Sequence, residues 1–313
     1  MNKIKHTSLL IICCFFIACS STSQEHKVEK TIDTSGINWN IDDSIVYSYF
    51  QEKPVSDYAN HWIYYMVGDG EHQFETPPFD RISEIKECYE QVIRILENFT
   101  FRNEALVNEV FVDDLALLES VNIIFTVGMP SMYDAFVCQY EGVYYITLDV
   151  VNFANYIQNG HDVSELLSNF VTHEVVHILM KTKYPYEEMT YKDYLDYVAF
   201  HEGFAHLLSY KEDIADYELD DSYGEKFNTS QNNLVKALNE TDPAMQRQYL
   251  YEANTGRYWD KFAAISSMLF LLNHQDSLKE IYYHGWRGYT DLIVKYEWNT
   301  ETYFHKNCYE KLI

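Results

Sequence analysis

Two histidines four residues apart constrain this chain more than any other feature, in the run His173-Glu174-Val175-Val176-His177. In an α-helix, residues at positions i and i+4 lie on one face, about one turn apart. The polar residues just upstream gather on a different arc of the same predicted helix: Ser164, Glu165, Ser168, Asn169 and Thr172. The two histidines therefore fall on the buried side, where burial of imidazole and carboxylate groups is costly unless something compensates for it.

A metal ion would provide that compensation. Two imidazoles on one helix face can both reach a zinc ion, at about 2.0–2.1 Å each. Glu174 points sideways from the same turn and can contact a zinc-bound water without being a ligand. H-E-x-x-H on a helix is a signature of zinc metalloproteases. The alternative interpretation is a pair of core histidines without a metal.

A catalytic zinc site takes three protein ligands and a water, so a third ligand should lie downstream. The candidate is Glu202, which stands in a second helical pattern over residues 190–210. The interval after His177 leaves room for the first helix to end, for a loop, and for a second helix to pack back across the first. His201 and His206 are the rival third ligands.

The pair H-E-x-x-H plus a later Glu resembles the gluzincin branch of zinc metallopeptidases, which includes thermolysin and the zinc aminopeptidases. The run Glu202-Gly203-Phe204-Ala205 is identical to the third-ligand helix of the aminopeptidases. The resemblance covers about residues 165–210. It implies a zincin-like fold that binds one Zn²⁺ per chain through His173, His177 and Glu202, with Glu174 as general base.

The sequence departs from the gluzincin pattern in two places. Four residues after the third ligand, gluzincins usually carry a carboxylate that orients a zinc-binding histidine, whereas this chain has His206. His206 would take that orienting role or contact substrate. The chain also lacks the G-x-M-E-N segment with which aminopeptidases hold a free amine, since the Gly128-Met129-Pro130-Ser131 turn does not match it. The resemblance therefore does not imply an exopeptidase.

The resemblance implies two further parts of the site. Gluzincins use a Tyr or His roughly 60 residues beyond the third ligand to stabilise the oxyanion. Tyr258 is the first candidate for this role and His284 the second. Peptide substrates commonly add a strand to an exposed sheet edge, and the strand Val143–Leu148 is the candidate edge.

Hydrophobic patterning predicts an α+β fold, with a mixed half over residues 36–160 and a helical half over 161–313 that flank an active-site cleft. The predicted strands are residues 45–50, 61–67, 121–127 and 143–150. The predicted helices are residues 82–96, 104–119, 163–181, 190–210, 224–240, 257–273 and 288–296. Within the predicted helix over 257–273, residues 263–272 are apolar enough to form a buried helix.

The N-terminus has the pattern of an export signal. Lys3 and Lys5 precede an apolar run, Leu9–Ala18, that is too short to span a bilayer. The run Phe16-Ile17-Ala18-Cys19 resembles the lipobox of bacterial lipoproteins, with Phe16 in place of the usual Leu. It implies a signal peptide over residues 1–18, a lipid on Cys19 and a flexible tether over 19–35. The alternative is an ordinary signal peptide with an incidental Cys.

The resemblance places the mature protein in the bacterial cell envelope, lipid-anchored and facing the periplasm or the cell surface. Export makes a disulfide possible, and Cys88, Cys138 and Cys308 allow at most one. The chain has 48 acidic and 23 basic residues, a formal charge of −25. This charge argues against nucleic-acid binding and against a basic membrane-docking face. The expected partners are a peptide or protein substrate, and the membrane only through the lipid.

The sequence thus favours a zinc-dependent, membrane-tethered peptidase. Two other functions remain open. One is a zinc-containing lipoprotein that binds peptides or proteins with little turnover, although Glu174 favours an enzyme. The other is a zinc amidase that acts on a non-peptide substrate, for which a more enclosed site would be expected.

Overall fold

The computed structural model describes residues 30–34, 37–67, 74–116, 118–210 and 221–298. Cys19 and the signal segment lie outside the described residues, and so does Cys308. The fold is mixed α+β and divides into two compact units. The first unit comprises residues 1–100 and 117–175, and the second comprises 101–116 and 176–313. The division falls within one continuous helix, α6 (Val163–Lys183).

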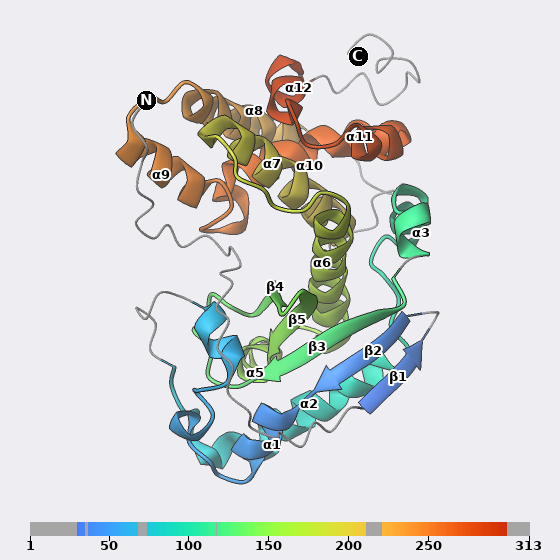
Figure 1. The fold of residues 1–313 in the computed structure, drawn as a ribbon, viewed down its shortest axis with the longest axis vertical. Helices are drawn as coiled ribbons and strands as arrows, with labels where there is room; N and C mark the ends of the chain where they lie inside the picture. The colour runs from blue at the N-terminus through green and yellow to red at the C-terminus, as the bar shows by residue number, and fades with distance from the viewer. Residues whose placement is uncertain (1–29, 35–36, 68–73, 117, 211–220, 299–313) are drawn as a thin grey trace. The chain divides into compact units, whose positions relative to one another are not determined.

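The first unit is built on a five-stranded sheet (Figure 1). Its strands, in the order β1-β2-β3-β5-β4, are β1 (Lys30–Thr34), β2 (Ile37–Asp42), β3 (Ser120–Thr126), β5 (Val143–Asp149) and β4 (Ala135–Tyr140). The three inner strands are parallel, and the outer strands β1 and β4 are antiparallel to their neighbours. The parallel pairing of β2 with β3 brings Ile41 opposite Ile123, so the sheet joins distant parts of the chain.

The predicted edge strand is wrong, because Val143–Leu148 lies inside the sheet between β3 and β4. The edge is β4, which the patterning did not predict. Glu141 and Gly142 have positive φ angles of 50° and 82° and form a two-residue turn that pairs Tyr140 with Val143. Such turns join antiparallel hairpin strands. Strand β5 therefore folds back alongside β4, and β4 pairs with the side of β5 that was predicted to be exposed.

The start of the first unit also differs from the prediction. Residues 30–34 of the predicted tether are paired with β2 as strand β1, and residues 19–29 lie outside the described residues. The strands predicted at 45–50 and 61–67 are wrong: the segments form helix α1 (Ser44–Phe50) and the 3₁₀ helix η2 (Trp62–Met66). Asp42 accepts hydrogen bonds from the backbone and hydroxyl of Ser44, which favours a helical start over continued β structure.

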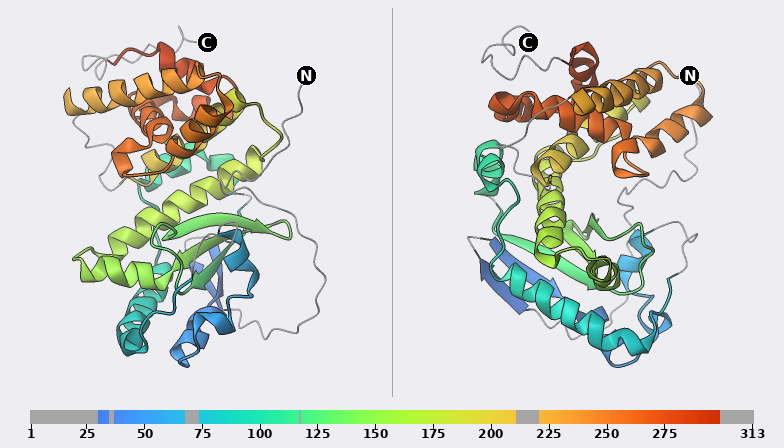
Figure 2. Two further views of the ribbon diagram at one scale, coloured as in Figure 1. Left: turned by 90° about the vertical axis from the view of Figure 1, so that its left-hand side faces the viewer. Right: turned by 180° about the vertical axis from the view of Figure 1, so that it is seen from behind.

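Helices cover the sheet of the first unit. Helix α2 (Ile82–Leu96) has the predicted bounds and buries the apolar stripe that predicted it. Figures 1 and 2 show α1 and α2 along one face of the sheet, and α2 packs against α5 (Val150–Gln158). Helix α5 begins where β5 ends, because buried Asp149 accepts hydrogen bonds from the backbone of Val151 and Asn152. Burial raises the pKa of Asp149 to about 7.

The described residues of the second unit form helices joined by loops and turns, with no strand among them. Its helices, apart from the end of α6, are α3 (Glu104–Val110), α4 (Val112–Leu115), α7 (Tyr191–Leu208), α8 (Asp221–Leu238), α9 (Pro243–Glu252), α10 (Phe262–Leu272), α11 (Leu278–His284) and α12 (Tyr289–Lys295). The single helix predicted at 104–119 is wrong, since it breaks at Phe111 into α3 and α4. Short 3₁₀ helices complete the structure: η1 (Val55–Asp57), η3 (Phe79–Arg81), η5 (Tyr258–Asp260) and η6 (Gln275–Ser277).

Helix α10 forms the centre of the second unit. All of its residues are buried, as predicted for 263–272, and it packs against α7 and α8. Asp196 of α7 is also buried and accepts hydrogen bonds from the backbone of Gly288 and Thr290, which fixes the start of α12 against α7. None of the described helices is both long and apolar enough to cross a membrane. Cys88 and Cys138 are buried free thiols.

Candidate metal centre

Local sequence positions the two helices that carry the predicted ligands. At the start of α6, the Asp162 carboxylate accepts a hydrogen bond from the backbone of Glu165, at 2.9 Å. At the start of α7, Thr190 and Asp193 form a capping box in which each side chain accepts from the other's backbone N–H. Such caps satisfy backbone groups that the first helical turn leaves without partners. The caps fix the residue at which each helix begins. They therefore help to determine which face of the helix each predicted ligand occupies.

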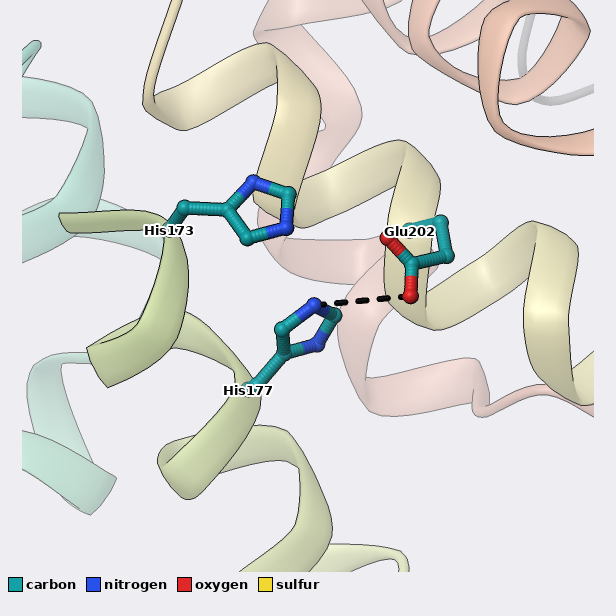
Figure 3. Close-up of side chains that lie close together, drawn as sticks. All are labelled: His173, His177 and Glu202. Carbon is teal, nitrogen blue, oxygen red and sulfur yellow. Dashed lines mark ion pairs between the residues drawn. The ribbon is translucent and has the colours of Figure 1, made fainter. Parts of the chain in front are cut away.

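The structure brings the three predicted ligands together (Figure 3). One ligand atom each from His173, His177 and Glu202 lies within 4.8 Å of the other two. The Nε2 atom of His177 is 3.5 Å from the Oε1 atom of Glu202. Figure 3 shows the two imidazoles projecting from one helix toward the carboxylate on the other. The prediction that both histidines lie on one face of α6 is therefore confirmed.

The donor set fits a zinc ion. Two imidazole nitrogens and a carboxylate oxygen are ordinary zinc ligands, and a fourth position remains for water. Ligands bound tetrahedrally at about 2.0–2.1 Å would lie roughly 3.3 Å apart. The separation of His177 from Glu202 is already close to this value, and a ligand atom of His173 lies within 4.8 Å of both.

Glu174 is next to His173 on α6 and only 5% exposed. Among the described residues, no hydrogen bond or ion pair holds its carboxylate. A buried carboxylate normally has a partner, because loss of its hydration is otherwise uncompensated. Its position beside a group of metal ligands is consistent with a partner that belongs to the reaction, such as an attacking water.

His206 is buried and lies beside the carboxylate of Glu202. Its Nε2 atom is 4.0 Å from Oε2 of Glu202, while Oε1 of the same carboxylate faces His177. The two oxygens of Glu202 are therefore directed to different neighbours. The structure thus places His206 next to the predicted third ligand, Glu202.

His201 is the other rival third ligand, and the structure directs it elsewhere. Its ring stacks on Tyr197 with the centroids 3.9 Å apart and lies nearly parallel to His177 at 6.5 Å. Burial, with smaller contributions from His177 and Lys181, lowers the pKa of His201 well below its usual range. Neither His201 nor His206 belongs to the converging ligand group found among the described residues.

The two oxyanion candidates differ sharply in position. Tyr258 lies in η5 with its ring against His206, at a centroid distance of 5.4 Å. Its hydroxyl donates to the sulfur of Met268 at 3.2 Å, and burial raises its pKa. His284 is exposed at the end of α11, and no contact given for the described residues joins it to the ligand group. Tyr258 is thus the candidate that lies near Glu202.

Gly203, directly after the third ligand, has a packing role that the sequence did not reveal. A Cβ atom at this position would lie 1.7 Å from Oγ and 2.4 Å from Cβ of Ser267 on α10. The Ser267 hydroxyl is itself hydrogen-bonded to the Tyr289 hydroxyl at 2.8 Å. Helices α7 and α10 therefore approach so closely next to Glu202 that only glycine fits at position 203.

Gly203→Ala is expected to destabilise the protein, because overpacking a tight core typically costs about 1–3 kcal/mol. The free energy of unfolding, measured by urea denaturation, should fall by an amount in this range. The effect should be smaller when the same substitution is made in a Ser267→Gly background, where the clashing atoms are gone. An equal loss in both backgrounds would show that the α7–α10 contact is not the cause.

Comparison of this chain with protein-family models, with curated proteins and with solved structures found no match. Function must therefore be inferred from the site itself. The ligand group followed from spacing and resemblance, whereas the Gly203–Ser267 contact and the position of His206 required the folded chain. No local signal in the sequence links residues 203 and 267.

Proposed function

We propose that this protein is a zinc-dependent peptidase of the gluzincin type. The observation that carries the proposal is the convergence of His173, His177 and Glu202, with Glu174 buried on the same helix. The fold is consistent with a zincin-like arrangement. It has a mixed sheet with parallel inner strands and antiparallel edge strands, then a helix bearing H-E-x-x-H and a second helix bearing the Glu.

In this mechanism the ligands hold the metal and Glu174 moves the proton. Bound zinc would lower the pKa of a water toward 7 and polarise the scissile carbonyl. The Glu174 carboxylate accepts a proton from the attacking water and later delivers it to the nitrogen of the leaving amine. The absence of a fixed partner for Glu174 among the described residues is consistent with this exchange. Tyr258 remains the candidate donor to the oxyanion, provided that its hydroxyl leaves Met268.

His206 has a positioning role in this scheme. It faces Oε2 of Glu202, so a hydrogen bond from its imidazole would hold that oxygen away from the metal. Oε1 then remains directed toward the side where His177 lies. Partners of this kind orient the ligands and tune the affinity for the metal. A histidine in place of the usual carboxylate would thus act on the third ligand instead of on an imidazole.

Strand β4 is the corrected candidate for binding an extended peptide. It pairs with β5 on one side and has no strand partner on the other among the described residues. The edge strand of a sheet offers backbone N–H and C=O groups to an added strand. The proposed substrate is therefore a peptide or an unfolded segment of a protein.

The test is hydrolysis of an unbiased peptide library by purified protein whose metal content has been measured. The proposal predicts about one zinc per chain and cleavage that a chelator abolishes. Zinc without cleavage, together with peptide binding, would favour the binding module instead. Zinc with cleavage only of small non-peptide amides would favour the zinc amidase. A protein that binds no zinc would reject all three functions.

We also propose that the protein is a lipoprotein anchored through Cys19. Replacing this residue by serine, Cys19→Ser, should release soluble protein or leave uncleaved precursor, because an N-terminal diacyl or triacyl anchor requires the thiol. Partition into detergent and the mass of the N-terminal peptide measure the outcome. A correctly processed Cys19→Ser form that stays fully in the membrane fraction would contradict the proposal.

A further inference from the structure

The second unit contains a recess of about 420 Å³ that is separate from the ligand group. It lies among α8, α9 and the segment that contains η5 and the start of α10. Its lining residues are Thr229, Ser230, Asn233, Gln248, Tyr251, Glu252, Thr255, Gly256, Trp259, Asp260 and Phe262. The volume is within the range of about 300–1,000 Å³ in which small-molecule sites fall. None of the proposed metal ligands lines it.

Bonds within the recess fix which hydrogen-bonding atoms remain for a ligand. Gln248 Nε2 donates to Glu252 Oε1, and Thr255 Oγ1 donates to the backbone oxygen of Tyr251, both at 2.5 Å. Lys236 Nζ donates to Asn233 Oδ1 at 3.2 Å. Within the described residues, the amide oxygen of Gln248 and the hydroxyl oxygen of Thr255 are thus left as acceptors, and the amide nitrogen of Asn233 and the second N–H of Gln248 are left as donors.

Hydroxyl groups supply further capacity of both kinds. Ser230 is buried at 3% exposure and lines the recess from α8, next to Thr229. Neither hydroxyl has a hydrogen-bond partner within the described residues. The lining also carries two carboxylates, Glu252 and Asp260, and neither Lys nor Arg. Donors and acceptors are therefore available together in a recess whose formal charge is negative.

Aromatic side chains supply an apolar surface beside these polar atoms. The Trp259 indole is half-buried, with Lys226 Nζ 4.1 Å from the ring centroid and the Tyr258 ring against it at 5.0 Å. These contacts hold the indole in place. Phe262 is buried and Tyr251 is exposed in the same lining. An aromatic wall next to mixed hydrogen-bonding groups suits a ligand that has both C–H faces and hydroxyls.

We propose that this recess binds a neutral saccharide. Sugar hydroxyls both donate and accept, so they can match Asn233 on one side and Gln248 and Thr255 on the other. An ammonium group offers donors only and would leave the Asn233 amide and the hydroxyl donors without acceptors. A phosphate would be repelled by Glu252 and Asp260, and a purely apolar ligand would desolvate both carboxylates.

The saccharide site is independent of the proposed peptidase activity, although it is connected to Glu202 through ring contacts. Trp259 contacts Tyr258, Tyr258 contacts His206, and His206 faces Glu202. Because no residue is shared, saccharide binding should persist in a His173→Ala variant. Failure of one proposal can thus be distinguished from failure of the other.

The experiment uses the full chain in detergent, with maltose, cellobiose, lactose and N,N′-diacetylchitobiose as probes at millimolar concentration. Saturation-transfer difference NMR and Trp fluorescence should detect binding of at least one disaccharide. Trp259→Ala and Asn233→Ala should each weaken it about tenfold or more, because each removes one of the two contact types. Asn239→Ala is the matched control, since that exposed side chain is on the loop after α8, outside the recess, and bonds Val235.

Three results would overturn the proposal. One is that none of the four disaccharides binds to correctly folded protein. Another is that binding persists unchanged in both Trp259→Ala and Asn233→Ala. The third is that Nα-acetyl-lysine amide, which has an ε-ammonium group, binds in the recess while the disaccharides do not. That result would assign the recess to a cationic ligand. If circular dichroism shows that Trp259→Ala does not fold, Trp259→Phe and Asn233→Ala decide the outcome.

Discussion

Glu174→Gln is expected to lower peptide hydrolysis by about 100-fold or more, the scale of general-base catalysis. Glutamine has nearly the same size and helix propensity but cannot take a proton from water. Glu174 is not one of the converging ligands, so zinc content should stay at the parent level. Thermal stability should also change little, because no hydrogen bond or ion pair of the carboxylate is lost within the described part of the chain.

The matched control for this experiment is Glu165→Gln, which makes the same chemical change in the first turn of the same helix. Glu165 is exposed, so its variant should cleave at the parent rate. Initial rates with the best library peptide, at equal zinc occupancy, give the comparison. A Glu174→Gln protein that cleaves as fast as the parent would rule out the proposed mechanism. If neither the parent protein nor Glu174→Gln cleaves the peptide but both bind it, the protein is a binding module.

His173→Ala is expected to remove most of the bound zinc while the fold is retained. The site then offers only His177 and Glu202, one ligand fewer than the three that catalytic zinc sites use. His173 is partly exposed, so truncation leaves a smaller packing defect than it would in the core. Metal analysis after dialysis against a weak chelator measures the first effect, and thermal denaturation measures the second.

His284→Ala provides the corresponding control, because it removes an exposed imidazole from the end of α11. Its zinc content should equal that of the parent protein. Full zinc occupancy in His173→Ala would reject the assigned ligands. An equal loss of zinc in both variants would point to an indirect effect, or to His284 as a ligand, and would also contradict the assignment.

Helices with a clear amphipathic period could be predicted from the sequence, and so could the pair of histidines. Helix α2 has the predicted bounds, and α6 and α7 lie within two residues of theirs. In these segments the local pattern and the tertiary burial agree. Glu202 required the resemblance as well, because spacing alone could not separate it from His201 and His206.

The errors arose where tertiary structure overrides a local pattern. The aromatic and β-branched residues of α1 favour a strand locally, but Ile45, Val46 and Tyr49 are buried at helical spacing. Helix α9 was not predicted, although its start has a local signal: Asp242, directly before Pro243, accepts hydrogen bonds from the backbone of Ala244 and Met245. The position of β5 inside the sheet depends on pairing with β4, which periodicity does not encode. The saccharide recess likewise combines residues from three segments that meet only after folding.

The contact between Gly203 and Ser267 limits how sequences that share this fold can diverge. A larger residue at 203 can be accepted only after position 267 has become smaller, so the order of the two substitutions matters during evolution. Position 203 adjoins a proposed metal ligand and position 267 is distant from it in the chain, yet the two should vary as a pair. Distant homologues could therefore be identified by a joint pattern at the two positions. Glycine at position 203 should occur with a small residue at 267, and a small residue at 203 should occur with glycine at 267.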